Sequence, residues 1–207
     1  YTHDWIRPFI SVGDGAGLKV FSRETGLFAS GGIDFGESRK RGDNRRLEGT
    51  GTIDNLFKYF AKVGIETTPF DFFVCANYFR IETEYAQKDR NKKYDAFLFS
   101  PRVITGYPVF ENLIFQLETG LTIMNESFAE AYHGIRYDTK YHTRYRASAG
   151  LHDAYAEMTI VFMPFDAVSV IGQGRYARLL GDAGRSPLTD KKNMFEGKLF
   201  AAYSFFP

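Results

Sequence analysis

Few residues of the chain could do acid–base or nucleophilic chemistry, and none of them stands in a catalytic spacing. His152 and Asp153 are neighbours within a segment of strand-like alternation. Because successive residues of a strand point to opposite faces, we expect the sheet to separate these two side chains. No serine stands in a nucleophile-elbow setting, and Cys75, which has no base beside it in the sequence, is interpreted as a small buried hydrophobe. The sequence therefore predicts a protein without enzyme activity.

The stretch 125–146 collects the aromatic and imidazole side chains that could bind a ligand. Its members are Tyr132, His133, Tyr137, Tyr141, His142 and Tyr145. They predict an aromatic and polar surface suited to contact with protein or glycan. The two histidines have no third histidine or close carboxylate beside them, so we expect no metal, and an enzyme that uses one of them is kept as an alternative. Because the sequence has no phosphate-binding glycine loop, dinucleotide fingerprint or nucleic-acid signature, no cofactor and no nucleic-acid partner is expected.

The elements that would carry these residues are strands, as the end of the chain illustrates. In the segment 194–207, Phe195 and Leu199 fall on one face, and Glu196 and Lys198 fall on the other. A strand with this pattern has one apolar and one polar face. A soluble sheet would turn the apolar face inward, whereas a transmembrane barrel would turn it toward lipid between two girdles of aromatic residues.

About ten segments of this kind follow one another, and their connections alternate in length. The short connections lie near 23–26, 67–71, 109–112 and 164–167, and the long charged ones lie at 37–48, 84–94, 125–146 and 181–193. This alternation is typical of outer-membrane barrels, which have short periplasmic turns and long extracellular loops. We therefore predict an all-β fold, a closed antiparallel transmembrane β-barrel that forms one domain over residues 1–207, in preference to a soluble barrel.

Composition agrees with a strand-rich chain and excludes a helical membrane protein. The 207 residues include 13 Tyr and 21 Phe, which favour strands. No uninterrupted apolar run reaches the roughly 18 residues that a membrane-spanning helix needs. The net charge of +1 indicates no particular partner, and a single cysteine excludes a disulfide within the chain.

Seven basic and seven acidic residues fall on the face that would line the barrel interior, and a subset of the charges on this face is expected to form a network. The network expected there comprises Lys58, Lys62, Arg102, Glu118, Glu157, Arg175, Glu196 and Lys198. Because a barrel of about ten strands is narrow and an unpaired buried charge is costly, we expect these charges to pair and fill the lumen. A narrow channel for small solutes is the alternative, although an ion-selective pore would show an excess of one sign.

Two of the long connections carry positive charge. Residues 37–48 and 84–94 each have a net charge of +2. If these loops face outward, their side chains lie beside the phosphates of lipopolysaccharide, which Arg and Lys bind well. The candidate lipopolysaccharide contacts are Arg39, Lys40, Arg41, Arg45 and Arg46, and a solvated loop surface is the alternative.

Three motifs in chain order are shared with a known family. The segment 178–188 contains an LLGDA..SP pattern, the segment 47–54 reads L-x-G-x-G-x-I-D, and an Arg-Pro element lies at 6–9. These motifs resemble those of the MltA-interacting protein (MipA/OmpV) family of outer-membrane proteins. The motif residues are Arg178, Leu179, Leu180, Gly181, Asp182, Ala183, Ser186, Pro187, Gly49, Gly51 and Asp54. In the first motif we interpret Asp182 as capping a turn through its own backbone.

The resemblance implies a non-enzymatic β-barrel in the outer membrane of a Gram-negative bacterium. The family usually has a further strand before the Arg-Pro element, so the resemblance implies ten to twelve strands in the intact barrel. It also implies a scaffold of the cell envelope, which in some members links a murein-cleaving transglycosylase to a murein synthase. Expected partners are outer-membrane lipid, lipopolysaccharide and other cell-envelope proteins, among them a murein hydrolase or synthase or another outer-membrane protein.

Overall fold

The computed structural model describes residues 6–11, 15–22, 25–35, 57–67, 78–88, 96–138, 140–165 and 168–203. They form one antiparallel sheet in which ten strands follow chain order and each pairs with its neighbours in sequence. The strands are β1 (Ile6–Ser11), β2 (Gly15–Phe21), β3 (Leu27–Phe35), β4 (Phe57–Thr67), β5 (Tyr78–Lys88), β6 (Ala96–Phe110), β7 (Leu113–Met124), β8 (Gly150–Phe165), β9 (Val168–Leu179) and β10 (Asn193–Tyr203). Two helices, α1 (Glu126–His133) and α2 (Gly181–Arg185), lie in the connections after β7 and β9. The all-β, antiparallel prediction is confirmed.

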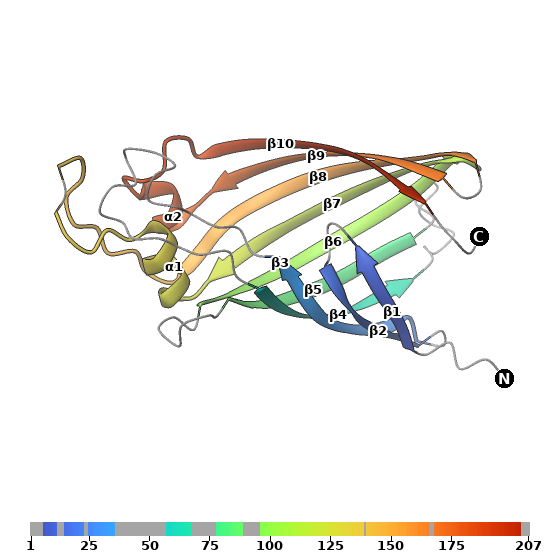
Figure 1. The fold of residues 1–207 in the computed structure, drawn as a ribbon, viewed down its shortest axis with the longest axis horizontal. Coiled ribbons are helices and arrows are strands. Elements are labelled where there is room, and N and C mark those ends of the chain that lie inside the picture. The colour runs from blue at the N-terminus through green and yellow to red at the C-terminus, as the bar shows by residue number, and fades with distance from the viewer. Residues whose placement is uncertain are drawn as a thin grey trace.

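The predicted closure of the barrel is not found among the described strands. The sheet is curved, but β1 and β10 are its two edges and do not pair with each other (Figure 1). Alternation along a strand indicates which face is apolar, whereas closure depends on how strand tilt and stagger combine around the whole sheet. The sequence pattern therefore predicts the wall but does not by itself predict that its edges meet.

One face of the sheet exposes its apolar side chains. Phe195 is 82% exposed and Leu199 is 78% exposed, although both belong to the most regular strand of the sequence. Large apolar side chains are also exposed at outward positions of β6–β8, namely Val103, Leu117, Leu121, Met158 and Phe162. This arrangement reverses that of a soluble sheet, which would bury these side chains, and it agrees with a wall that faces lipid.

The connections are segregated to the two ends of the sheet. Figure 1 shows α1 and α2 together at one end of the sheet, and the start of β1 and the end of β10 at the other. The two-residue turn Glu111–Asn112 joins β6 and β7, and the Asn112 carbonyl accepts a 2.8 Å hydrogen bond from the Met163 amide of the neighbouring hairpin. In the part of the chain that the structure describes, no helix has the length and apolar composition needed to cross a membrane.

The interpretation of 125–146 as a loop was wrong at its start, where α1 forms. Asn125 caps this helix because its side chain accepts a 2.9 Å hydrogen bond from the Phe128 amide. The same Asn125 oxygen accepts a bond of 3.1 Å from the Phe97 amide of β6, so the cap also ties the helix to the sheet. An Asn followed by Glu126 is a helix-start signal, which the abundance of polar residues in this stretch obscured.

Candidate functional site

The candidate site is a polar network on the inner face of the sheet, built by β6, β7 and β8. The Arg102 guanidinium lies 3.5 Å from Glu118 Oε1, and both side chains are about nine-tenths buried, with 14% and 13% exposed. The Tyr155 hydroxyl donates a 2.7 Å hydrogen bond to the same Glu118 oxygen. One carboxylate is therefore held by a cation and a phenol from the two flanking strands.

Gly120 makes this arrangement possible. It is the register partner of Tyr155, and a Cβ added to it would lie 2.7 Å from the Tyr155 hydroxyl oxygen and 2.9 Å from a ring carbon. Any larger residue at this position would push the ring off β7. The glycine thus lets Tyr155 lie across the neighbouring strand and reach Glu118, which is two residues earlier in β7.

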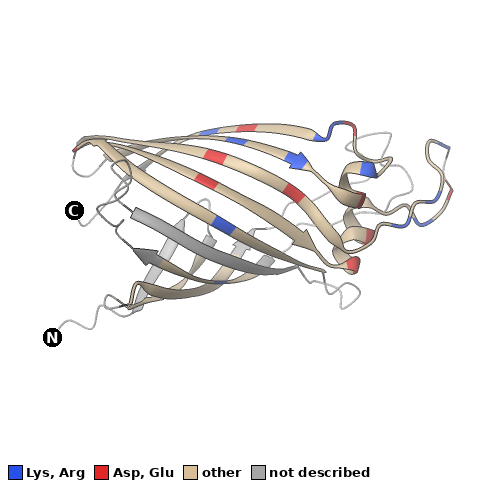
Figure 2. Cartoon of the chain, turned by 180° about the vertical axis from the view of Figure 1, so that it is seen from behind, with Lys and Arg blue, Asp and Glu red and all other residues tan. Residues whose placement is uncertain are grey.

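The network continues across β9 toward the end of the sheet that carries the helices. The Arg175 guanidinium lies 3.9 Å from the centre of the Tyr155 ring, a cation–π contact, and 4.0 Å from Asp153 Oδ1. Asp153 is buried, and the Thr122 hydroxyl donates a 3.2 Å hydrogen bond to its Oδ1. Charged positions accordingly form a band across the strands (Figure 2).

The expected separation of His152 from Asp153 was wrong. His152 Nδ1 and Asp153 Oδ2 are in hydrogen-bond contact. The cause is a register shift, because Thr122 pairs with Asp153 while the next residue, Ile123, pairs with Leu151, which leaves His152 as an extra residue in β8. Such a bulge breaks the alternation of side chains, so adjacent residues can share a face.

The pair lies beneath the helix α1, among aromatic rings. The His133 and His152 rings are 5.1 Å apart between centroids, and the Phe128 ring meets His152 edge-on at 5.7 Å. The Thr122 hydroxyl is bonded to Asp153, so it is not directed at the imidazole as a nucleophile would be. Among the residues that the structure describes, no group of three or more His, Cys, Asp or Glu is placed to hold a metal ion.

The LLGDA..SP motif bonds to two other segments at this end of the sheet. We call α1, α2 and residues 145–148 together the clasp. Asp182 Oδ2 accepts a 2.9 Å hydrogen bond from the Ser148 amide, and Asp182 Oδ1 accepts one of 2.8 Å from Arg185. The Ser186 hydroxyl donates a 2.7 Å bond to the His133 carbonyl at the end of α1. The Asp182 carbonyl does accept the Ser186 amide, as a capped turn requires, but its side chain reaches across to a different segment.

Backbone conformation explains the glycine at motif position 181, and packing explains the alanine at 183. Gly181 has a φ of 49°, in the left-handed region that favours glycine, and Ala183 is completely buried. Leu179 is also buried, and together with Ala183 it belongs to the cluster of apolar residues beneath the helices. The other members of that cluster are Ala96, Met124, Phe128, Ala129 and Ala147.

Electrostatics inside the clasp follow from these contacts. The hydrogen bonds from Arg185 and the Ser148 amide hold the pKa of Asp182 below its ordinary value, because they stabilise the ionised carboxylate. Burial, together with the nearby Asp182 charge, raises the pKa of Tyr145, whose hydroxyl donates to the Asp182 carbonyl at 3.2 Å. Asp182 is therefore an anion, and Tyr145 a neutral donor, at neutral pH.

Of the remaining predicted network residues, Glu157 lies within this cluster, and the others lie apart from it or outside the described residues. Glu157 is a half-buried register partner of both Glu118 and Arg175. Glu196 and Lys198 pair with each other at 3.0 Å on the edge strand and stay more than half exposed. Lys62 lies 5.1 Å above the Phe60 ring. The side chains of Lys58 and Cys75 are outside the described residues, as are the motif residues Gly49, Gly51 and Asp54 and the loop cations Arg39, Lys40, Arg41, Arg45 and Arg46.

Sequence reasoning missed the residues that join the charges to one another. Tyr155 and Thr122 were not among the predicted network, because an aromatic or hydroxyl residue on the polar face of a strand carries no charge signal. The Gly120 position directly across from Tyr155 was the available clue, since glycine inside a strand often marks a close approach by another group.

One family model and two solved structures are similar to the chain. A family model described as MltA-interacting protein MipA matches residues 1–205. No curated protein sequence matches the chain significantly. Among solved structures, outer-membrane expressed OmpT of Vibrio cholerae is 14% identical, with a TM-score of 0.47 over 91% of this chain and 55% of that chain. In-vitro folded OmpT of the same organism is also 14% identical, with a TM-score of 0.46 over 98% of this chain and 62% of that chain. The chain thus spans less than two thirds of the length of either structure.

Proposed function

Because the chain belongs to the MltA-interacting protein MipA family, we propose that it is a non-enzymatic scaffold whose ten-strand sheet is the wall of a closed barrel. The chain is an outer-membrane protein, as the family match and the strand-rich structure indicate. The scaffold role, the closure and the partner are the proposal.

The exposed apolar face is the observation that carries this proposal. Exposure of Phe195 and Leu199 to hydrocarbon has no free-energy cost, whereas their exposure to water would favour aggregation. Lipid cannot satisfy the open edges of β1 and β10, because unpaired backbone groups cost several kcal/mol each in a bilayer. Ten strands in a meander place the first and last strands antiparallel, so β1 and β10 can pair directly or through further strands.

The inner face favours a scaffold over a channel. Arg102, Glu118, Tyr155, Arg175 and Asp153 bond to one another rather than stand free along a water-filled path. A narrow lumen filled in this way is rigid and resists ion flow. Planar-bilayer recording tests whether the lumen conducts ions. Steady conductance through the purified protein would refute the scaffold proposal in favour of a small-solute channel.

The partner that we propose is a murein-cleaving transglycosylase, which the family description supports through the words MltA-interacting. A murein synthase bound at the same time would make the protein a link between the two machineries. The periplasmic turns are the part of a barrel that reaches murein enzymes, since long loops face outward. At the β6–β7 turn, the exposed Phe110 and Glu111 offer an apolar and an acidic contact.

Docking can be tested with the full chain in detergent and a purified transglycosylase. We expect the two to co-elute on size exclusion, and we expect the paired change Phe110→Ser and Glu111→Lys to abolish the complex. The matched control is Arg136→Glu, an exposed residue at the opposite end of the sheet, which should leave the complex intact. Loss of the complex in the control alone, or no complex with the unmodified protein, would refute docking through the turns.

The basic loop cations are part of the same proposal, as contacts for lipopolysaccharide. Arg39, Lys40, Arg41, Arg45 and Arg46 belong in the sequence to the long connection between β3 and β4. Arginine is suited to phosphate because its planar donors bind two oxygens at once. Charge removal at all five positions should weaken binding to vesicles that contain lipopolysaccharide, with little change for uncharged vesicles.

A further inference from the structure

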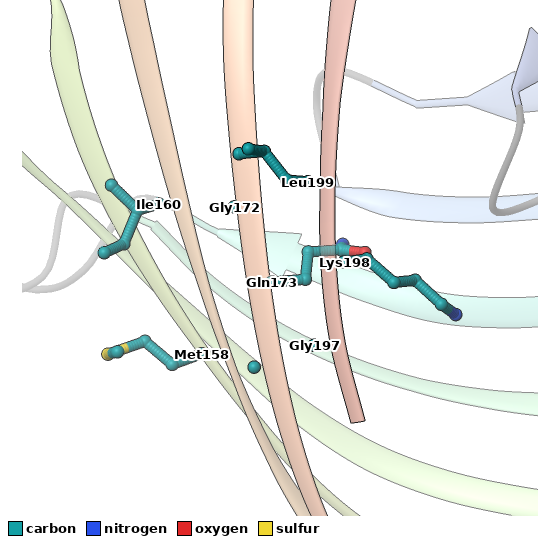
Figure 3. A pocket seen from close by; sticks show the side chains of 8 residues that line it. Met158, Ile160, Gly172, Gln173, Gly197, Lys198 and Leu199 are labelled. Atoms are coloured by element: carbon teal, nitrogen blue, oxygen red, sulfur yellow. The ribbon is translucent and has the colours of Figure 1, made fainter. Parts of the chain in front are cut away.

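The outer wall of β8, β9 and β10 contains a groove at three of its glycines. It is shallow, with a volume of about 350 Å³, and its floor is formed where Gly172, Gly174 and Gly197 have no side chains. Met158 and Ile160 flank it on one side and Leu199 on the other (Figure 3). The outward-facing residues that line the groove are apolar, and the polar residues Gln173 and Lys198 also border it (Figure 3).

Cations lie beyond one end of this groove, on the same strands. Arg178 follows Gly174 on the same outward face of β9 and is exposed. Lys191 and Lys192 immediately precede β10, and the Lys192 carbonyl accepts the Leu179 amide at 2.7 Å, which holds this segment beside the end of β9. None of the three cations forms an ion pair within the described part of the chain, and Asp190 is the one acidic residue next to them in sequence.

An aromatic pair separates the groove from the cations. The Tyr176 and Phe195 rings are 4.9 Å apart between centroids, and the Tyr176 hydroxyl donates a 3.1 Å bond to Asn193. Aromatic residues with a polar tip prefer the boundary between hydrocarbon and headgroups. The order along the strands is therefore cation, interfacial aromatic, apolar groove, which is the order of the chemical parts of a lipid.

The distances agree with one lipid leaflet. Arg178 and Gly172 are six residues apart in β9, which corresponds to about 20 Å of strand at roughly 3.3 Å per residue. With a strand tilt of about 40°, this is a depth of about 15 Å, half of a hydrocarbon core that is about 30 Å thick. A phosphate bound at Arg178 would thus have its acyl chain reach the deepest glycine of the groove.

We propose that β8–β10 hold a specific binding site for lipid A, the phosphorylated glycolipid part of lipopolysaccharide, with phosphate at Arg178 and Lys191 and an acyl chain in the glycine groove. The site lies in the outer leaflet if the end of the sheet with the long loops faces outward, as proposed above. The lipid site does not depend on the proposed scaffold role. The residues of this site are different from the loop cations at 39–46, which belong to another connection in the sequence.

The test is native mass spectrometry of the full chain in detergent with diphosphoryl lipid A as the probe. We expect one lipid A to be retained, and the double change Arg178→Gln and Lys191→Gln to weaken its binding about tenfold or more, because each cation contributes about 1 kcal/mol to an anionic headgroup. Gly174→Val should also weaken it several-fold by filling the groove. A Cβ at Gly174 has no atom within 4 Å, so this change is compatible with the fold.

Two control variants and two control lipids make the result decisive. Lys140→Gln removes an exposed loop cation, and Thr119→Val alters an outward position of β7 outside the groove, so neither should change binding. Dephosphorylated lipid A should bind as weakly to the unmodified protein as lipid A does to the double variant. Equal retention of phosphatidylglycerol, or unchanged lipid A binding in the double and Gly174→Val variants, would overturn the site. Binding in detergent does not depend on a transglycosylase, so this outcome is independent of the docking experiment.

Discussion

The two ends of the sheet are held together by different means. At the clasp, Phe128 is 5% exposed and Ala129 and Ala183 are completely buried, so side-chain packing fixes the helices to the strands. At the turns, Phe110 is 65% exposed and Phe165 is 72% exposed, and backbone pairing joins the hairpins. The comparison indicates that the clasp is the part of the described structure with a core like that of a soluble protein, whereas the turn end depends on its surroundings.

The largest loss of stability is expected when an aromatic ring is removed from the clasp. Removal of a ring from the turn end provides the comparison. We expect Phe128→Ala to lower the free energy of unfolding by about 3–5 kcal/mol, since it empties a buried site. Phe165→Ala, a matched change at an exposed position, should cost less than about 1 kcal/mol. Urea titration in lipid vesicles measures both values. Equal losses would show that the clasp is no better packed than the turn end.

A second comparison sets the inner face against the outer face with one substitution. Tyr155→Phe removes the hydroxyl that donates to Glu118 and leaves that buried carboxylate with Arg102 alone, at an expected cost of about 1–3 kcal/mol. Tyr176→Phe removes a hydroxyl from an exposed bond to Asn193 and should cost less than about 0.5 kcal/mol. The same unfolding titration applies, and a Tyr176 effect as large as the Tyr155 effect would contradict a network confined to the inner face.

Much of the wall could be predicted from the sequence, because its pattern is local. Alternation at Phe195, Glu196 and Lys198 indicates two faces without any knowledge of neighbouring strands, and the structure has Phe195 exposed as a lipid-facing wall requires. The match of the family model confirms the resemblance that the LLGDA..SP motif indicated. The alternation along each strand does not predict whether β1 and β10 pair, because closure depends on the tilt and stagger of all the strands together.

The site was predicted less well, because its contacts depend on irregular backbone and on partners distant in sequence. One extra residue in β8 brings His152 and Asp153 to the same face, and strict alternation excludes that arrangement by assumption. Asp182 bonds to Ser148, 34 residues away, so its role as a clasp could not be read from its own turn. The Arg102–Glu118 pair could be predicted from the sequence because both residues lie on the polar face of adjacent strands.

A smaller effect is expected at Asn125, the residue that caps α1. Asn125→Ala removes the cap of α1 and the bond to the Phe97 amide, and it should lower the free energy of unfolding by about 1–2 kcal/mol. Ser127→Ala, two residues into the same connection, is the matched control and should be nearly neutral. Hydrogen exchange of the Phe128 amide would show whether the loss is local to the helix start. Unchanged exchange there would mean that packing of the ring, rather than the cap, holds α1.

The smallest effect should be a local change with pH at Asp182. Its pKa lies below the ordinary 3.8 because Arg185 and the Ser148 amide bond to the carboxylate. A lowered pKa means that the carboxylate stabilises the clasp above the ordinary value, and that this contribution is lost as the pH falls through the lowered pKa. We therefore expect the exchange protection of the Ser148 amide, corrected for its intrinsic pH dependence, to fall as the pH drops below the ordinary value of 3.8 and through the lowered pKa of Asp182. In Asp182→Asn the protection should be low and independent of pH, while the Leu180 amide, which donates to the His152 carbonyl at 2.8 Å, serves as the internal control. If the Ser148 amide kept a pH-dependent protection in Asp182→Asn, another carboxylate would have to control the clasp.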